Sequence, residues 1–145
     1  MFLRKAEQKD KNTIGSLALL LWPGHAVEEL REEIAEILKS KEAVFFLAVE
    51  GEEAIGFSQC QLRHDYVEGT NSSPVGYLEG IFVKERFRKR GIAGALLLQC
   101  QNWAKEKGCT EFASDCELHN EASRSFHLHH GFQEANRIIC FTKPL

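Results

Sequence analysis

The sequence contains no apolar run that approaches the ~20 consecutive residues needed to cross a bilayer. Residues 1–7 lack the apolar core of a signal peptide. Internal repeats and low-complexity tracts are absent as well. We therefore expect a cytoplasmic protein that does not associate with membranes.

Basic residues are not in excess, because 18 Lys and Arg stand against 21 Asp and Glu, for a formal net charge of -3. This balance provides no basic field for a nucleic acid, although it is compatible with a cationic substrate. Hydrophobic residues at 43% and charged residues at 27% are ordinary for a globular protein. A length of 145 residues predicts a single domain over residues 1–145.

Metal and redox motifs are also missing. The cysteines form no Cys-x-x-Cys pair, and no histidine stands at zinc-finger spacing from two of them. We expect reduced thiols that pack as small core residues, and no metal site. The cysteines are Cys60, Cys100, Cys109, Cys116 and Cys140.

The chain does contain an alternation of strand and helix patterns. Such alternation places helices over a mixed sheet, so the predicted fold class is α/β with a central mixed sheet flanked by helices. The predicted strands are 1–4, 43–49, 54–62, 77–83 and 111–116, the predicted helices are 10–21, 27–38, 91–107 and 121–129, and a final strand pair is expected to start at Gly131 and to end near Thr142.

Residues 78–98 join an apolar strand to an apolar helix through a basic turn. The first N–H groups of a helix have no internal partners and its dipole is positive at that end, so such a turn attracts an anion. The basic run 88–90 adds positive charge, and Gly91 and Gly94 leave room for an anion at the backbone. Neither the nucleotide P-loop nor the Gly-x-Gly-x-x-Gly pattern is present. We interpret the turn as a cradle for a pyrophosphate.

Residues 88–93 match the Gln/Arg-x-x-Gly-x-Gly/Ala signature of the GCN5-related N-acetyltransferases, so the turn resembles the loop that wraps the pyrophosphate of acetyl-CoA in that family. Residues 120–132 are similar to a second segment of the family, with Ser123 in place of a small alanine and His127 in place of a common tyrosine. The resemblance implies the fold of this family over nearly the whole chain and acetyl-CoA as cosubstrate.

Five further blocks, at 22–25, 63–67, 72–74, 78–83 and 113–115, make the chain similar to the aminoglycoside 6′-N-acetyltransferases within this family. By this resemblance the cofactor would contact Ile81, Phe82, Val83, Arg88, Lys89, Arg90, Gly91, Ile92, Ala93, Gly94 and Asn120. The antibiotic would contact Trp22, His25, Tyr66, Glu79 and Asp115, and Asn136 stands where close relatives have an acidic contact. The resemblance also implies a homodimer in which Tyr66 reaches the partner's cleft.

Acetyl transfer to an amine requires that the amine lose a proton, that the thioester carbonyl be polarised and that the departing thiolate be stabilised. Glu79 would accept the proton directly or through a water, or would only anchor the substrate, and Asp115 would converge on the same cleft. A backbone N–H of residues 81–83 would meet the oxyanion. His127 would protonate the thiolate, unless water does so.

The sequence therefore favours an enzyme that acetylates the 6′-amine of aminoglycosides, which confers resistance, by direct transfer in a ternary complex. Two alternatives stay open. One keeps the chemistry and changes the acceptor to a polyamine, another small amine or a protein N-terminus, and Asn136 supports it. The other is a CoA-binding sensor without catalysis.

Overall fold

The structure is a computed structural model that describes all residues, Met1–Leu145. A five-stranded sheet forms its centre, with the strands side by side in chain order. Strands β1 to β4 pair antiparallel, and β5 pairs parallel to β4, so the sheet is mixed. The strands are β1 (Phe2–Lys5), β2 (Ala43–Glu50), β3 (Glu53–Arg63), β4 (Val75–Val83) and β5 (Phe112–Ser114).

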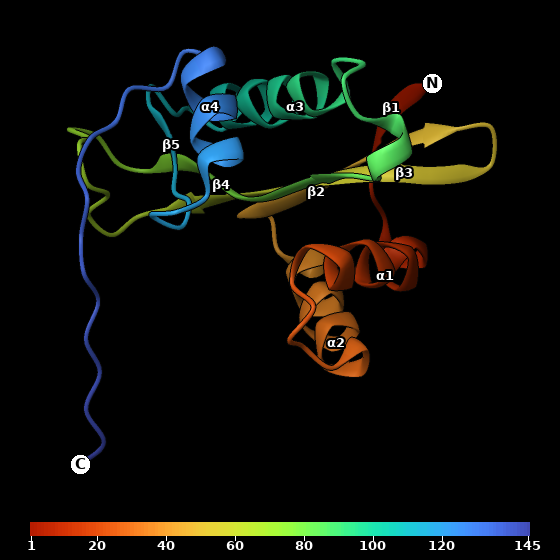
Figure 1. Ribbon diagram of the computed structural model, residues 1–145, viewed down its shortest axis with the longest axis horizontal. Helices are drawn as coiled ribbons and strands as arrows, with labels where there is room; N and C mark the ends of the chain where they lie inside the picture. Colours follow the sequence, from red (N-terminus) through yellow and green to blue (C-terminus); the bar gives the residue numbers. More distant parts are fainter.

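Helices cover both faces of the sheet, with α1 and α2 on one face and α3 and α4 on the other (Figure 1). Successive side chains of a strand point to opposite faces, and β2 therefore buries Phe45 and Leu47 under α1 and α2 and Val44 and Phe46 under α3. None of the helices is long and apolar enough to span a bilayer. The helices are α1 (Lys11–Leu21), α2 (Val27–Lys39), α3 (Ile92–Glu106) and α4 (Glu121–His129), and short 3-10 turns cover Gln8–Asp10 and Glu85–Phe87.

Helix α2 illustrates how the sequence pattern determines the packing. Leu30 and Ile34, one turn apart, are its buried residues and lie in the core with α1. Glu28 and Glu29 lie in its first turn, where negative charge stabilises the helix dipole. Charged side chains occupy the opposite face of α2. The helix therefore packs on α1 and the sheet through one apolar stripe.

Strand β4 is irregular at Glu79. Its pairing with β3 shifts there, because Leu78 opposes Cys60 whereas Gly80 opposes Gln59. This is a β-bulge, which breaks the alternation of side chains and is often found beside active sites. Glu79 is therefore the extra residue of β4, placed opposite the junction of two β3 residues.

The other edge of β4 is paired for only part of its length. Strand β5 pairs with residues 76–78 and no further. Residues 79–83 of β4 therefore have no strand on this side, and the backbone groups that point to this side lack a strand partner. This open edge leads directly into the turn before α3.

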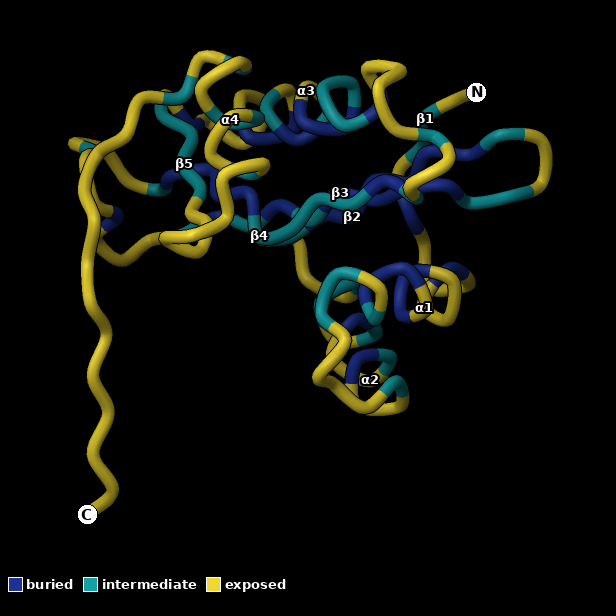
Figure 2. The backbone as a smooth tube through the Cα atoms, in the orientation of Figure 1, coloured by how far each residue is buried: buried dark blue, intermediate teal, exposed yellow.

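The final strand pair that the sequence predicted from Gly131 to Thr142 is wrong. No strand follows α4, and the last residues run away from the sheet as an extended tail (Figure 1). A strand needs a neighbour for its backbone N–H and C=O groups, and no other strand lies alongside this tail. The tail is exposed along its length (Figure 2). The other predicted elements begin and end within two residues of the observed ones, so the predicted mixed sheet with flanking helices is confirmed.

Candidate active site

A cavity of about 240 Å³ lies between α1, α2 and the sheet, and we name it the acceptor cavity. Three residues predicted to contact an acceptor, Trp22, His25 and Glu79, line it together. Trp22 directly follows α1, and its ring packs edge-on against Phe57 with 6.2 Å between centroids. The other lining residues are Ala18, Leu30, Glu33, Ile34, Ile37, Phe45 and Gln59. An aromatic wall and two carboxylates, those of Glu33 and Glu79, suit a cation.

Glu79 is held by an arginine. Arg63, the last residue of β3, donates from Nε and Nη2 to the two carboxylate oxygens of Glu79, each at 2.9 Å. The Arg63 guanidinium also lies over the ring of Tyr77, 3.4 Å from its centroid. A bidentate arginine fixes the plane of a carboxylate and leaves its remaining lone pairs for other donors. Glu79 is therefore oriented before a ligand arrives.

Tyr77 extends this network to the second predicted carboxylate. Its hydroxyl donates a hydrogen bond to Asp115 Oδ2. Burial, together with the Asp115 carboxylate, raises the pKa of Tyr77 well above its ordinary value, so the hydroxyl stays protonated. A continuous chain of contacts thus runs from Glu79 through Arg63 and Tyr77 to Asp115. Asp115 itself does not line the acceptor cavity.

Two other residues predicted to contact the acceptor also lie outside the cavity. Tyr66, in the loop between β3 and β4, is 75% exposed. Asn136 lies in the tail and donates from Nδ2 to Glu68 Oε1 at 3.2 Å. Within one chain, therefore, the structure does not bring Tyr66 and Asn136 together with Trp22 and Glu79.

The turn between β4 and α3, residues 88–94, has the geometry of an anion site, and we name it the cofactor turn. Lys89 and Gly91 have positive φ values of 63° and 77°. The first hydrogen bond of α3 runs from the Ala95 N–H to the Gly91 carbonyl, so the N–H groups of residues 92–94 have no helical partner. A Cβ built on Gly91 would meet nothing within 4 Å. Free donors and open space therefore occur together at this turn.

The arginines of the cofactor turn are already engaged. Arg88 donates from Nε to the Val83 carbonyl at 2.8 Å, which braces the turn against β4. Arg90 forms an ion pair with Glu50 at 2.9 Å, and its hydrogen bonds lower the pKa of Glu50. Lys89 makes no ion pair. Lys89 is thus the cation of the predicted pyrophosphate cradle with neither an ion pair nor a hydrogen bond, whereas Arg88 is anchored through Nε but has no acidic partner.

Gly94 and Asn120, both predicted to contact the cofactor, also have structural roles. A Cβ on Gly94 would lie 2.7 Å from Cε1 of His130, so glycine allows this histidine to pack against α3. The side chain of Asn120 caps α4, because its Oδ1 accepts from the Ser123 N–H at 3.1 Å. The close approach of His130 is a second reason for glycine at position 94, beside the room for an anion that the sequence suggested.

His127 of α4 lies beside β5, where β4 and β5 part. Its Nδ1 is 2.7 Å from the carbonyl oxygen of Ser123, and its Nε2 is 2.8 Å from Oγ of Ser114. The ring packs against those of Phe126 and Phe132, at 5.8 and 4.9 Å between centroids. Both ring nitrogens are thus occupied by protein groups.

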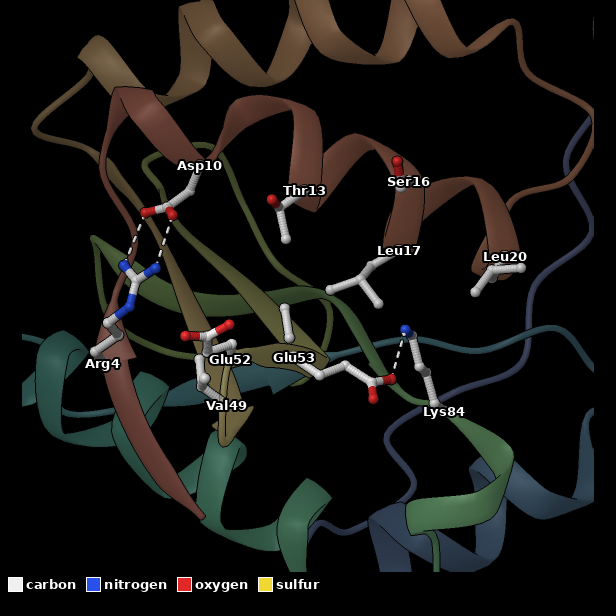
Figure 3. Close-up of a pocket in the computed structure, with 11 residues that line it drawn as sticks. Arg4, Asp10, Thr13, Ser16, Leu17, Leu20, Val49, Glu52, Glu53 and Lys84 are labelled. Atoms are coloured by element: carbon white, nitrogen blue, oxygen red, sulfur yellow. Dashed lines mark hydrogen bonds and ion pairs between the residues drawn. The ribbon is translucent and has the colours of Figure 1, made fainter.

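A larger cavity of about 420 Å³ lies between α1 and the β2–β3 hairpin (Figure 3). Four of its five charged groups pair with one another, Arg4 with Asp10 at 2.7 Å and Lys84 with Glu53 at 3.0 Å, and Glu52 has no ion-pair partner. None of the residues predicted to act in catalysis or binding lines it. The candidate active site is therefore the smaller cavity together with the cofactor turn.

Sequence reasoning missed several residues of this site. Tyr77 stands two residues before the predicted Glu79 on one strand, a spacing that could have suggested a common face. Arg63 belongs to one of the sequence blocks, but its pairing with Glu79 depends on the register of β3 and β4. Glu33 lies on the polar side of an amphipathic helix and carries no signal of its own.

An open strand edge that leads into an anion-binding turn, beside a cavity with carboxylates, is an arrangement for acyl transfer from a phosphate-bearing cosubstrate. Residues 12–132 match the model of the acetyltransferase (GNAT) family. The protein belongs to this family, as its sequence motifs predicted.

Its relatives within the family are aminoglycoside-modifying enzymes. The chain is 44% identical over 123 residues to the aminoglycoside N(6')-acetyltransferase type 1 of Salmonella typhimurium, which covers 85% of each chain. It is 40% identical over 147 residues to that of Klebsiella aerogenes, covering 99% of this chain and 96% of the relative. The structure of AAC(6')-Iy in complex with the bisubstrate analogue CoA-S-monomethyl-acetylneamine matches with a TM-score of 0.95 and 39% identity, over 99% of this chain and 98% of that chain. AAC(6')-Ih from Acinetobacter baumannii matches with a TM-score of 0.92 and 36% identity, over 99% and 98% of the two chains.

Proposed function

We propose that the protein transfers the acetyl group of acetyl-CoA to the 6′-amine of aminoglycosides. The observation that carries the proposal is the position of Glu79. This carboxylate lines the acceptor cavity at the bulge of β4, and the same strand runs on into the cofactor turn. An amine bound at Glu79 and a cosubstrate bound along the open edge of β4 would therefore meet at one point.

The residues of the cavity supply the acceptor side of the reaction. The Glu79 charge attracts the ammonium group of the acceptor, and the carboxylate then accepts its proton directly or through a water. Arg63 fixes the orientation of Glu79 through two hydrogen bonds, and Tyr77 does the same for Asp115 with one. Trp22 forms an apolar wall against which a sugar ring stacks.

The cofactor turn and the open edge of β4 fit acetyl-CoA. The free N–H groups of residues 92–94 and the Lys89 ammonium would hold its pyrophosphate. The unpaired backbone of residues 81–83 would bind its extended arm, with one N–H directed at the oxyanion. Acetyl-CoA supplies the activated acetyl group. No cysteine lines the acceptor cavity, so we propose direct transfer in a ternary complex.

Steady-state thiol release from acetyl-CoA tests the reaction, with two aminoglycosides that differ in carrying a 6′-amine or a 6′-hydroxyl. We expect efficient turnover with the amine alone. Equal turnover with both would contradict the proposed 6′ position. Turnover only with a polyamine, another small amine or a peptide would assign a different acceptor, and acetyl-CoA binding without turnover for any amine would identify a sensor.

We further propose that the protein forms a homodimer through its C-terminal tail. Ile138, Ile139 and Phe141 are 74%, 80% and 88% exposed, and a cluster of large apolar side chains in water is typical of an interaction surface. The tail is already extended, and β5 ends the sheet with a free edge. In a dimer, Tyr66 of one chain would be free to complete the acceptor cavity of the other.

Light scattering of the full chain tests the dimer. We expect the mass of two chains for the wild type and of one chain for the double variant Ile139→Glu/Phe141→Glu, with Lys143→Glu as the control in the same tail. A wild type that remains monomeric at micromolar concentration would overturn the proposal.

We also propose a cytoplasmic location, because all five cysteines are free and reducing compartments keep thiols in that state.

A further inference from the structure

Both ring nitrogens of His127 have protein partners, and one of these partners lies where β4 and β5 part. Nδ1 lies 2.7 Å from the backbone carbonyl oxygen of Ser123 and 3.4 Å from its Oγ. A carbonyl oxygen only accepts hydrogen bonds, so the shorter contact assigns a hydrogen to Nδ1. Nε2 is then the acceptor in the neutral ring, and it faces Oγ of Ser114 at 2.8 Å. Any proton that His127 exchanges with the cleft through Nε2 therefore passes through the Ser114 hydroxyl.

Ser114 has two hydrogen-bond partners but only one hydrogen. Its Oγ lies 2.8 Å from Nε2 of His127 and 3.3 Å from the carbonyl oxygen of Leu78. When His127 is neutral, the hydroxyl donates to Nε2. When His127 is protonated, Nε2 donates to Oγ, and the hydroxyl hydrogen turns toward the Leu78 carbonyl. The charge of His127 therefore sets the direction of the Ser114 hydroxyl.

Ser114 lies where the pairing of β4 and β5 ends. Ser114 is the last residue of β5, and it opposes Leu78, the last residue of β4 that β5 pairs with. The next residue of β4 is Glu79, at the bulge. The hydroxyl thus lies at the fork where the two strands part and where the open edge of β4 begins.

We propose that Ser114 passes the proton of His127 to the thiolate that acetyl transfer releases. The Ser114 O–H bond breaks as the S–H bond forms, while the Nε2–H bond of His127 breaks as a new Ser114 O–H bond forms. His127 ends neutral and takes its next proton from solvent. Acetylation removes two protons from the acceptor ammonium, and both leave through Glu79, while His127 takes up one proton from solvent for the thiolate, so each turnover releases one proton overall. This inference rests on the proposed acetyl transfer.

The neighbouring titratable groups are engaged elsewhere. His129 and His130 end the same helix, and burial followed by the charges of His129 and His127 lowers the pKa of His130. The ring of His130 packs on Phe126, 4.5 Å between centroids. Asp115 follows Ser114 in the chain, but its carboxylate accepts from the Tyr77 hydroxyl. The hydrogen bond between His127 and Ser114 connects α4 directly to the point where β4 and β5 part.

The rate of thiol formation in a single turnover of the acetyl-CoA-loaded enzyme tests the step. We expect Ser114→Ala to slow it about 100-fold, the usual scale for loss of a proton donor, with the Kd for acetyl-CoA unchanged. Ser114→Thr keeps the hydroxyl and should restore most of the rate. Ser125→Ala is the matched control, because it removes an exposed hydroxyl of the same helix that makes no hydrogen bond with His127. His127→Ala combined with Ser114→Ala should be no slower than the slower single variant, since the two residues act as one unit.

The tautomer of His127, read from its ring ¹⁵N shifts at alkaline pH, gives a measurement that needs no substrate. We expect the Nδ1–H form. An Nε2–H form would overturn the assigned hydrogen bonds, and a Ser114→Ala rate within about 3-fold of wild type would overturn the relay, because general acids typically contribute far more. Absence of transfer to any amine by the wild type would instead refute the proposed function, while the tautomer would still report on the Ser114–His127 pair.

Discussion

The cofactor turn takes its binding groups from one continuous segment, whereas the acceptor cavity assembles them from four elements. Residues 81–94 supply the open edge of β4, the basic turn and the first N–H groups of α3. The cavity takes Trp22 from the end of α1, Glu33 from α2, Gln59 from β3 and Glu79 from β4. The first kind of site is specified by local sequence and the second by sheet register and helix packing.

The two regions are alike in one respect, because each has its principal charge paired within the protein. Glu79 of the cavity is bound by Arg63, and Arg90 of the turn is bound by Glu50. The Glu79 side chain is only 21% exposed, whereas those of Arg90 and Glu50 are 47% and 36% exposed. Water screens the pair at the turn more than the pair in the cavity. Changes in the cavity should therefore have larger effects than changes in the turn.

The largest effect is expected for Glu79→Gln. The amide keeps a hydrogen-bond acceptor for Arg63 but removes the charge and the basicity, so the single-turnover rate should fall about 100-fold or more. The Kd for acetyl-CoA should stay unchanged. Glu33→Gln is the control in the same cavity, and it should raise the KM for the acceptor with little effect on kcat. A Glu79→Gln rate near that of wild type would show that Glu79 only anchors the substrate.

Tyr77→Phe should have the next largest effect. It removes the donor to Asp115 and keeps the ring under Arg63. A hydrogen bond to a charged group contributes about 1.5–3 kcal/mol, so kcat/KM should fall at least about 10-fold, again with unchanged acetyl-CoA affinity. Ser16→Ala provides a control that removes a side-chain hydroxyl from α1 whose hydrogen bond stays within that helix. Equal losses for the two variants would mean that the link between the carboxylates has no specific role.

These two variants also mark how far sequence reasoning reached. Helical periodicity and strand alternation are local, and they predicted the helices and strands up to α4. The cofactor turn was found for the same reason, because strand, basic run and glycine adjoin in the chain. The link between Glu79 and Asp115 was not found, because Arg63 meets Glu79 only through the register of β3 and β4. The tail after Gly131 has the composition of a strand, but a strand also needs a partner that no sequence pattern within one chain supplies.

Lys89→Ala should have a smaller effect, confined to the cofactor side. Lys89 has neither an ion pair nor a hydrogen bond within the turn, and an exposed charge contributes about 0.5–1 kcal/mol, so the Kd for acetyl-CoA should rise about 2- to 5-fold. The rise should shrink as salt increases, because the charge is solvent-exposed. Lys105→Ala, in the last turn of α3, is the control for loss of one positive charge at the other end of this helix. The same rise for both lysines would mean that net charge, and not the position of Lys89, sets the affinity.

The smallest change, Glu50→Gln, should strengthen binding. Glu50 competes with the cofactor for Arg90, and removing its charge frees the guanidinium for a phosphate. Because the pair is exposed and screened, the Kd for acetyl-CoA should fall only about 2-fold. Glu52→Gln, in the same hairpin turn but without an ion pair, should leave the Kd unchanged. A weaker affinity for Glu50→Gln would mean that Glu50 positions Arg90 for the cofactor instead of competing for it, and the cofactor turn would then resemble the acceptor cavity, where Arg63 positions Glu79.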